Sequence, residues 1–291
     1  MPDSTDDQTV SWRALLAETT QLIGDSAHAR WLCEVASSSP SGDEFMAEIE
    51  QFATIRMVAH LDAMVARYRA GEPLQYVLGE WTFRRIELAI DQRVLIPRPE
   101  TEVVAGVAIE KAAAAGPTRT VADLGTGSGA IGLALADELP RDGTTVWITD
   151  ASVDALNVAR ANLAGLGPAA RNVRVAHGSW IEALPVDQQF DVIVSNPPYV
   201  AIGSPDVESS VTDWEPAQAL FAGRDGLDDL RLIGAAAIDR LHDGGWLVLE
   251  IGADQGNALR ELMVAVGYDE IEIRPDLAGL DRVALGRRPP G

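Results

Sequence analysis

The tetrapeptide Asn196-Pro197-Pro198-Tyr199 combines residue types that can bind a planar amino group. Two successive prolines remove two backbone N–H donors and restrict the residue before each of them, which leaves a stiff turn rich in acceptor oxygens. The side-chain oxygen of Asn196 and the carbonyl oxygen of Pro197 can accept the two hydrogens of an NH2 group, while the ring of Tyr199 covers its face. A tetrapeptide taken alone could also be only a rigid loop, so the neighbouring residues decide between the two interpretations.

The residues before the tetrapeptide predict how it is positioned. Residues 190–194 are mostly apolar and β-branched, as in a buried strand. Open α/β sheets bind their ligands beside the carboxyl ends of strands. The tetrapeptide therefore occupies the place in the chain where such a sheet holds its ligand.

A glycine-rich turn predicts a second part of the site. Residues 121–132 have the pattern of a strand, a turn that contains Gly125, Gly127 and Gly129, and the start of a helix. Glycines let the backbone pass close to a ligand, and a helix N-terminus offers free N–H donors. The pattern occurs in NAD enzymes and in methyltransferases, so it does not identify the ligand by itself.

Asp150 ends the next predicted strand, 25 residues after Gly125. At this spacing a carboxylate can accept hydrogen bonds from both hydroxyls of a ribose. The alternative is that Asp150 caps the following helix, although Ser152 can serve as that cap. We therefore expect Asp150 to bind the ribose of a nucleotide cofactor.

The tetrapeptide distinguishes between two such cofactors. NAD requires a site for its nicotinamide and a nearby residue that handles a proton. S-adenosyl-L-methionine requires only a rigid slot that directs its sulfonium methyl group at a nucleophile. Asn196-Pro197-Pro198-Tyr199 suits the second requirement and has no obvious role in the first, which favours S-adenosyl-L-methionine.

Composition excludes several classes of function. The 291 residues are 47% hydrophobic and 23% charged, which is typical of a globular protein with an ample core. A formal net charge of −21 argues against a partner held mainly through phosphates, because such binders gather lysine and arginine. The single cysteine, Cys33, excludes an internal disulfide and a thiolate metal cluster, and the four histidines lack metal-ligand spacing, so we expect no metal.

The N-terminal sequence and the apolar runs predict a location. Residues 1–7 are acidic and polar and lack the shape of a signal peptide. No apolar run approaches the ~20 residues that a membrane-spanning helix needs. These features predict a cytoplasmic protein without a membrane partner.

The sequence pattern divides the chain into three expected parts, which are a helical domain over 1–80, a β-hairpin linker over 81–98 and an α/β domain over 99–291. Apolar residues at helical spacing predict helices over 12–23 and 27–35 in the first part. They also predict a long helix over 45–68, which Asp43 can cap. Alternating apolar residues from Trp81 onward predict the hairpin.

Strand and helix patterns alternate through the α/β domain, which predicts a doubly wound and mostly parallel sheet. With a final pair of strands at the carboxyl end, the expected sheet has seven strands. These are Thr120–Leu124, Thr145–Thr149, Val173–Ala176, Phe190–Ser195, Trp246–Ile251, Ile271–Arg274 and Arg282–Gly286.

Together with the turn and the tetrapeptide, four further segments make the chain resemble the release factor glutamine methyltransferase family. In chain order they are Gly71-Glu72-Pro73-Leu74-Gln75-Tyr76-Val77-Leu78-Gly79, Leu95-Ile96-Pro97-Arg98-Pro99-Glu100-Thr101-Glu102, Asp213-Trp214-Glu215-Pro216, and Asp276-Leu277-Ala278-Gly279-Leu280-Asp281-Arg282-Val283. The resemblance covers nearly the whole chain. It implies the fold of class I S-adenosylmethionine-dependent methyltransferases.

The resemblance also implies which residues contact the cofactor. They are Gly125, Thr126, Gly127, Ser128 and Gly129 at the methionine end, Asp150 at the ribose, Trp180 beside the adenine, and Asn196. Trp180 could equally be a core aromatic residue. Family members commonly carry an acid just before this tryptophan, and the hydroxyl of Ser179 here can meet the adenine amino group less strongly.

Residues 98–101 lie where the family folds a segment over the cofactor, which gives Arg98, Glu100 and Thr101 a possible contact with it. An ion pair of Arg98 with Glu100 or Glu102 is the structural alternative.

The substrate that the resemblance implies is the glutamine of the Gly-Gly-Gln motif in class-1 peptide chain release factors. Asn196, Pro197 and Tyr199 would be catalytic, and Pro198 would join them in binding the substrate. The helical domain over 1–80 would dock the release factor, and no nucleic acid would be bound directly.

Two other substrates share this chemistry. A close relative methylates a glutamine of a ribosomal protein, and only the docking domain separates that activity from this one. An adenine-N6 nucleic-acid methyltransferase also grips an amine with Asn-Pro-Pro-Tyr, but it is expected to carry a basic recognition domain, which this acidic chain lacks. A binding module without catalysis is disfavoured because every reacting element is present.

Overall fold

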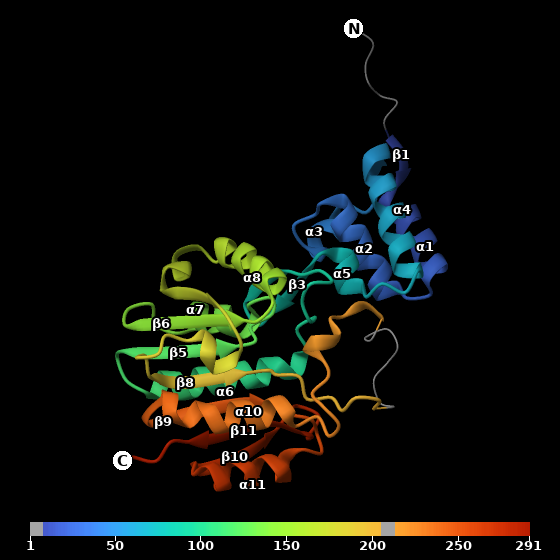
Figure 1. Cartoon of the computed structure of the whole chain (residues 1–291). Helices are drawn as coiled ribbons and strands as arrows, with labels where there is room; N and C mark the ends of the chain where they lie inside the picture. The colour runs from blue at the N-terminus through green and yellow to red at the C-terminus, as the bar shows by residue number, and fades with distance from the viewer. Residues whose placement is uncertain (1–7, 205–212) are drawn as a thin grey trace. The chain divides into compact units, whose positions relative to one another are not determined.

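The protein is described by a computed structural model that covers residues 8–204 and 213–291 (Figure 1). It divides into two compact units, with the boundary between Gly79 and Glu80. The acidic N-terminal residues 1–7 that entered the prediction of location lie outside the described residues.

The first unit consists of short helices and one small sheet. Its helices are α1 (Trp12–Ile23), α2 (Ser26–Ser37), α3 (Gly42–Ala47), α4 (Ile55–Arg69) and α5 (Leu74–Leu78), and its strands are β1 (Gln8–Ser11) and β2 (Phe52–Thr54). The two strands pair antiparallel. The apolar helix faces form one core, to which Leu32, Phe45 and Leu61 contribute fully buried side chains. The helices predicted over 12–23 and 27–35 are confirmed as α1 and α2.

The predicted long helix over 45–68 is wrong, because α3 and α4 are separated by β2. Ser41 rather than Asp43 caps α3, since its side-chain oxygen accepts a hydrogen bond from the Glu44 N–H at 3.2 Å. Thr54 caps α4 in the same way. Helical spacing of apolar residues does not exclude a strand of three residues, and the partner of β2 is a distant segment.

A β-hairpin opens the second unit. Its strands β3 (Glu80–Phe83) and β4 (Ile86–Ala89) pair antiparallel, so the hairpin is shorter than the predicted range 81–98. Asp91 accepts hydrogen bonds from the backbone N–H and the guanidinium of Arg93 and ends the strand in a turn. Pro97 and Pro99 cannot donate to a ladder, and the chain continues irregularly into α6 (Pro99–Ala114).

The second unit is built on a seven-stranded sheet. The strands are β5 (Arg119–Leu124), β6 (Thr144–Asp150), β7 (Val173–His177), β8 (Phe190–Ser195), β9 (Leu241–Glu250), β10 (Asp269–Pro275) and β11 (Asp281–Arg287). Their order is β10-β11-β9-β8-β5-β6-β7, and only the pairs that involve β11 are antiparallel. The predicted doubly wound, mostly parallel sheet of the class I methyltransferase fold is confirmed.

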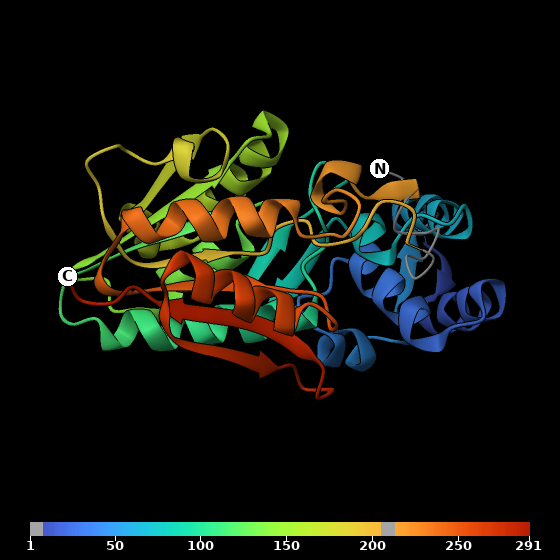
Figure 2. The same ribbon diagram turned by 60° about the horizontal axis from the view of Figure 1, so that its bottom comes forward.

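Helices cover both faces of this sheet. Besides α6, they include α7 (Ala130–Glu138), α8 (Val153–Gly165), α10 (Asp228–Ala237) and α11 (Gly256–Val266), with 3-10 turns η1 (Gly167–Asn172), η2 (Trp180–Ala183), η3 (Ala217–Ala219) and η4 (Ile238–Arg240). Figure 2 shows α10 and α11 side by side, and they pack on the face that carries Leu124 and Ile193. Side chains alternate along a strand, so Asp123 points to the other face, where it contacts Gly132 of α7.

The order of the strands brings the two predicted motifs together. β5 and β8 are parallel neighbours, and Leu124 pairs with Ser195 at their carboxyl ends. The Ser195 hydroxyl donates to the Leu124 carbonyl at 2.7 Å, which fixes this junction. The glycine turn and the tetrapeptide therefore leave the sheet next to each other, as expected at a point where the chain winds in opposite directions.

Among the residues that the structure describes, no helix has both the length and the apolar character required to cross a membrane.

Candidate active site

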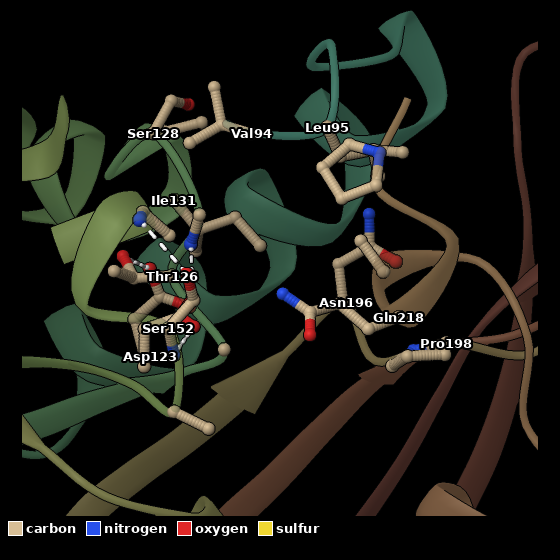
Figure 3. A pocket seen from close by; sticks show the side chains of 18 of the residues that line it. Val94, Leu95, Asp123, Thr126, Ser128, Ile131, Ser152, Asn196, Pro198 and Gln218 are labelled. Atoms are coloured by element: carbon tan, nitrogen blue, oxygen red, sulfur yellow. Dashed lines mark hydrogen bonds between the residues drawn. The ribbon is translucent and has the colours of Figure 1, made fainter. Parts of the chain in front are cut away.

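A cavity lies at the carboxyl edge of the sheet in the second unit (Figure 3). The predicted site residues that line it are Gly125, Thr126, Gly127, Ser128, Asp150, Trp180, Asn196 and Pro198, together with Ser179 and Thr101. Gly129, Pro197 and Tyr199 are outside its lining in the described part of the chain. The fold thus collects in one cavity residues that are about a hundred positions apart in the sequence.

The glycine turn presents its backbone to the cavity. Gly125 and Gly127 have φ values of 68° and 55°, a region that favours glycine. A Cβ atom added to Gly125 would lie 2.8 Å from the ring of Trp180, so a side chain would collide with the cavity wall. Asn162 of α8 holds the turn from behind by donating to the Ser128 carbonyl at 2.8 Å. Outside the lining, Gly129 caps α7 with a φ of 91°.

Asp123 is a buried carboxylate in the cavity wall that sequence reasoning missed. The residue is 1% exposed, and its Oδ2 accepts hydrogen bonds from the Thr126 hydroxyl at 2.5 Å and the Gly132 N–H at 2.8 Å. Its Oδ1 has no hydrogen-bond partner among the described residues. Burial raises the pKa of Asp123 to about 7 against these hydrogen bonds, and the Asp150 carboxylate raises it further. An acidic residue within the otherwise apolar run of residues 121–124 was the signal that could have revealed it.

Asp150 stands at the end of β6 with both oxygens directed by backbone donors. Its Oδ2 accepts from the Gly127 N–H at 2.9 Å, and its Oδ1 accepts from the Ser152 N–H at 2.8 Å. Ser152 caps α8 by accepting from the Ala155 N–H at 3.2 Å, so Asp150 is not the cap. Each carboxylate oxygen keeps acceptor capacity that a hydroxyl can use.

Trp180 forms a flat wall beside the glycine turn. Its indole Nε1 donates to the Asp229 carboxylate at 3.2 Å, and its backbone has an unusual φ of 42°. A bulky residue seldom adopts that conformation, so the surrounding contacts hold the ring in place. Ser179 lines the cavity next to it. The arrangement offers an apolar face with a hydroxyl at its edge.

Asn196 lies at the end of β8, on the side of the cavity where Figure 3 shows Pro198 and Gln218 and across from Thr126. Its side-chain Nδ2 donates to the Thr101 hydroxyl oxygen at 3.3 Å. Because the N–H group is engaged in this way, Oδ1 is the end of the amide that is available as an acceptor.

Tyr199 is fixed by polar contacts on the far side of the tetrapeptide. Its hydroxyl donates to Glu250 Oε1 at 3.1 Å and lies 3.5 Å from the Arg282 guanidinium, which donates to it. Burial and the Glu250 carboxylate raise the pKa of Tyr199 above its ordinary value. Gln255 donates to the Tyr199 carbonyl at 3.0 Å. The ring that the sequence assigned to the face of the substrate is therefore anchored through its hydroxyl.

Glu215 links the two segments that border the mouth of the cavity. The residue is 5% exposed, and its Oε2 accepts from the Ile96 N–H at 3.1 Å. Its Oε1 accepts from the Arg98 guanidinium. Both ion pairs considered from the sequence, Arg98 with Glu100 and Arg98 with Glu102, are therefore wrong. A partner over a hundred residues away gives no periodic signal in the sequence.

Several other lining residues were not predicted individually. They are Arg93, Val94, Leu95, Pro97, Ala130, Ile131, Ala151, Ser152, Ala155, Pro216, Gln218 and Ala219. Most are small or apolar residues in loops, and nothing in their type or spacing marks them as part of a site. The segments at 95–102 and 213–216 had been noted only through the family resemblance.

The sheet order is that of the Rossmann-like class I methyltransferase fold, and the cavity lies at the carboxyl edge of this sheet. The family model named methyltransferase small domain matches residues 107–213. A solved methyltransferase structure from Pyrococcus furiosus aligns with a TM-score of 0.52 and 18% identity, over 70% of this chain and 89% of that chain. At this identity the likeness concerns the fold alone.

Two curated relatives narrow the class. The release factor glutamine methyltransferase of Neisseria gonorrhoeae is 41% identical over 247 residues, which cover 84% of this chain and 85% of the relative. That of Vibrio cholerae is 43% identical over 230 residues, which cover 79% of this chain and 78% of the relative. The chain belongs to the release factor glutamine methyltransferase family, as its motifs predicted.

Proposed function

We propose that this protein transfers a methyl group from S-adenosyl-L-methionine to the side-chain amide nitrogen (N5) of the glutamine in the Gly-Gly-Gln motif of class-1 peptide chain release factors. The observation that carries the proposal is the placement of Asn196, whose Oδ1 is available at the junction of β5 and β8 beside the glycine turn. The names of the relatives support the substrate class.

The donors and charges of the cavity fit S-adenosyl-L-methionine. The cofactor carries a sulfonium and an ammonium charge, and the cavity wall holds the carboxylates of Asp123 and Asp150. The unpartnered Oδ1 of Asp123 suits a cationic ligand. We assign the turn 125–129 to the methionine end, Asp150 to the ribose, and Trp180 with Ser179 to the adenine. The bound cofactor supplies an electrophilic methyl group.

The tetrapeptide compensates for the low reactivity of the nucleophile, which is the side-chain nitrogen of the substrate glutamine. A carboxamide nitrogen reacts poorly because its lone pair is delocalised into the carbonyl group. Asn196 Oδ1 and the Pro197 carbonyl accept the two N–H groups of the substrate glutamine and hold its nitrogen in line with the methyl group. The same acceptors would stabilise the positive charge that develops on nitrogen as the N–C bond forms and the bond between the methyl group and the sulfonium sulfur breaks, which leaves a neutral thioether. The nitrogen then loses one proton to water, since the tetrapeptide contains no general base.

Pro198 and Tyr199 shape the slot around the substrate amide. Pro198 lines the cavity next to Asn196, and it has no N–H that could compete for the acceptors. Tyr199 is held by Glu250 and Gln255, so its ring can restrict the glutamine side chain without moving. We assign Asn196, Pro197 and Tyr199 to catalysis and all four residues to substrate binding.

We assign the docking of the release factor to the helical first unit. Residues 1–80 contain 13 acidic and 5 basic residues, a net charge of −8 that suits a basic partner surface. The same charge disfavours a nucleic-acid substrate. A ribosomal-protein glutamine remains the competing substrate, because the chemistry of the slot would be identical.

Labelled cofactor and separate substrates test the proposal. The protein is incubated with a class-1 release factor, with ribosomal proteins or with DNA, and the products are analysed by mass spectrometry. We expect the label only in the release-factor peptide that contains Gly-Gly-Gln, which gains the mass of one methyl group. Label in a ribosomal protein or in DNA, with none in the release factor, would overturn the proposal.

A further inference from the structure

A buried carboxylate behind the tetrapeptide has one oxygen without a partner. Glu250, the last residue of β9, is 1% exposed, and its Oε1 accepts from the Tyr199 hydroxyl. Its Oε2 is also buried and makes no hydrogen bond of ordinary geometry to any described residue. Buried carboxylate oxygens are rarely left unpaired, because their lost hydration must be replaced. Oε2 is therefore available to accept a hydrogen bond from a donor close to Glu250.

The hydroxyl of Thr101 is such a donor. Thr101 belongs to α6, which packs against β8 and β9, and its hydroxyl lowers the pKa of the Glu250 carboxyl, which burial raises to about 7. Thr101 is 3% exposed, and its oxygen also accepts from Asn196 Nδ2 at 3.3 Å. A hydroxyl has one proton and two lone pairs, so it can donate to a carboxylate and accept from an amide at the same time.

We propose that Glu250 and Thr101 are positioning residues that orient the amide of Asn196. Glu250 Oε2 accepts the Thr101 hydroxyl proton, the Thr101 oxygen accepts the Asn196 Nδ2–H, and Asn196 Oδ1 is thereby directed into the cavity. This chain of hydrogen bonds is called the Glu250–Thr101–Asn196 relay below. The inference rests on the proposed function, because it concerns the acceptor that holds the substrate amide.

The direction of the relay matters because the two ends of an asparagine amide act in opposite ways. With Oδ1 toward the substrate NH2 group, an acceptor meets a donor. A half-turn of the amide would place Nδ2 there, and two NH2 groups would face each other. Oxygen and nitrogen are nearly equal in size, so shape does not select the orientation and hydrogen-bond partners must do so. The prolines stiffen the backbone but leave this side-chain choice open.

The charge of Glu250 controls the relay. A carboxylate can only accept, so it requires the Thr101 proton, whereas a protonated carboxyl can donate to Thr101 and reverse the relay. Besides Thr101, the groups that act on Glu250 are Tyr199, Arg282 and Glu100. Arg282 favours the charged form, and Glu100 opposes it. The relay is therefore expected to strengthen as pH rises through about 7.

Kinetics with intact release factor and saturating cofactor test the relay. Thr101→Val removes the hydroxyl and keeps the branched shape, and we expect kcat to fall about tenfold or more, with cofactor Kd within about threefold. Thr101→Ser should recover most of the loss, because it restores the hydroxyl. The kcat of Glu250→Gln should fall by a similar factor. The variant that combines Thr101→Val with Glu250→Gln should have a kcat no lower than that of either single variant. If the two substitutions caused independent structural defects, their free-energy costs would add, and the double variant would be slower than either single variant.

Thr144→Val is the matched control. Thr144 is 5% exposed at the start of β6, its hydroxyl donates to the Pro140 carbonyl at 2.5 Å, and it does not line the cavity. This variant loses a buried hydroxyl of the same kind, so stability should fall while kcat stays within about twofold of the native value.

Nuclear magnetic resonance of protein labelled with 15N-asparagine reports the state of the Asn196 amide in the absence of substrate. The side-chain NH2 signals of Asn196, assigned by their loss in Asn196→Ala, should shift with a midpoint near pH 7. The shift should disappear in Glu250→Gln and in Thr101→Val. It should persist in Asp123→Asn, which removes another buried carboxyl whose pKa burial raises to about 7.

The two measurements separate failure of the relay from failure of the proposed function. Native methylation by Thr101→Val would overturn the relay and leave the proposed function standing. Absence of methylation by the wild-type protein, with Asn196 signals that still follow Glu250, would overturn the proposed function and support the relay. Asn196 signals that ignore both substitutions would overturn the relay whatever the activity.

Discussion

Replacement of Asp123 by asparagine should remove a pH-dependent loss of stability. The carboxyl of Asp123 is 1% exposed, and burial raises its pKa from 3.8 to about 7 in the folded protein. Because the folded protein holds this proton more tightly than the unfolded chain, the carboxyl stabilises the fold at low pH. That contribution is lost as pH rises from the unfolded pKa through the folded one.

The size of the effect follows from the pKa. Between the two values each pH unit removes ~1.4 kcal/mol of unfolding free energy. From pH 5.5 to pH 8 the loss from this group is about 2 kcal/mol, since it levels off above pH 7. The amide introduced by Asp123→Asn would keep an oxygen for the Thr126 hydroxyl and the Gly132 N–H, so the variant should lack this slope while preserving those hydrogen bonds.

Urea denaturation at pH 5.5 and pH 8, without nucleotide, measures the slope for each protein. The difference between wild type and Asp123→Asn isolates Asp123, because all other titrating groups are shared. Glu250→Gln is a matched comparison, since burial likewise raises the pKa of Glu250 to about 7 and predicts a similar change. Equal pH dependence in wild type and Asp123→Asn would show that this carboxyl is charged at little cost, and the reasoning from burial would be refuted.

Three further outcomes follow from the site. Asp150→Ala should weaken cofactor binding by about 1–3 kcal/mol in calorimetry, because ribose hydroxyls lose their acceptor, and an unchanged affinity would remove Asp150 from the site. Glu215→Ala leaves the Ile96 N–H and the Arg98 guanidinium without their acceptor, so cofactor affinity should fall by about 1–3 kcal/mol. Arg98→Ala removes only one of these two contacts and should weaken cofactor binding less. Equal losses of affinity in the two variants would argue against a role for the Ile96 contact. A chain that starts at Glu80 should bind cofactor normally yet lose activity on an intact release factor, and native activity would disprove the docking role of the first unit.

The fold was largely predictable because its signals are local. Runs of β-branched residues gave the strands of the second unit, and alternation with helices gave the parallel winding. The glycine turn and the end of β8 were brought together by the sheet order that this class of fold requires.

The remaining features depend on contacts between distant residues. β2 interrupts the predicted helix because it pairs with β1, and Glu215 rather than a neighbour in α6 binds Arg98. The partners of Thr101 and Glu250 are set by how α6 packs against β8 and β9, which no pattern within either segment encodes. Asp123 differs from these features, because an acidic residue within an apolar run is visible in the sequence even though it was not assigned to the site.

The central claim is that Asn196 acts on the substrate amide more than on the cofactor, and the most direct test is the methylation rate of the Asn196 variants. Release-factor peptide is followed by mass spectrometry, and cofactor affinity is measured in parallel. Asn196→Ala should lose about a hundredfold or more in rate with a much smaller change in cofactor affinity. Asn196→Asp should bind the cationic cofactor well and still react slowly, because its charge stabilises the bound cofactor more than the transition state. Near-native methylation by Asn196→Ala would contradict the account.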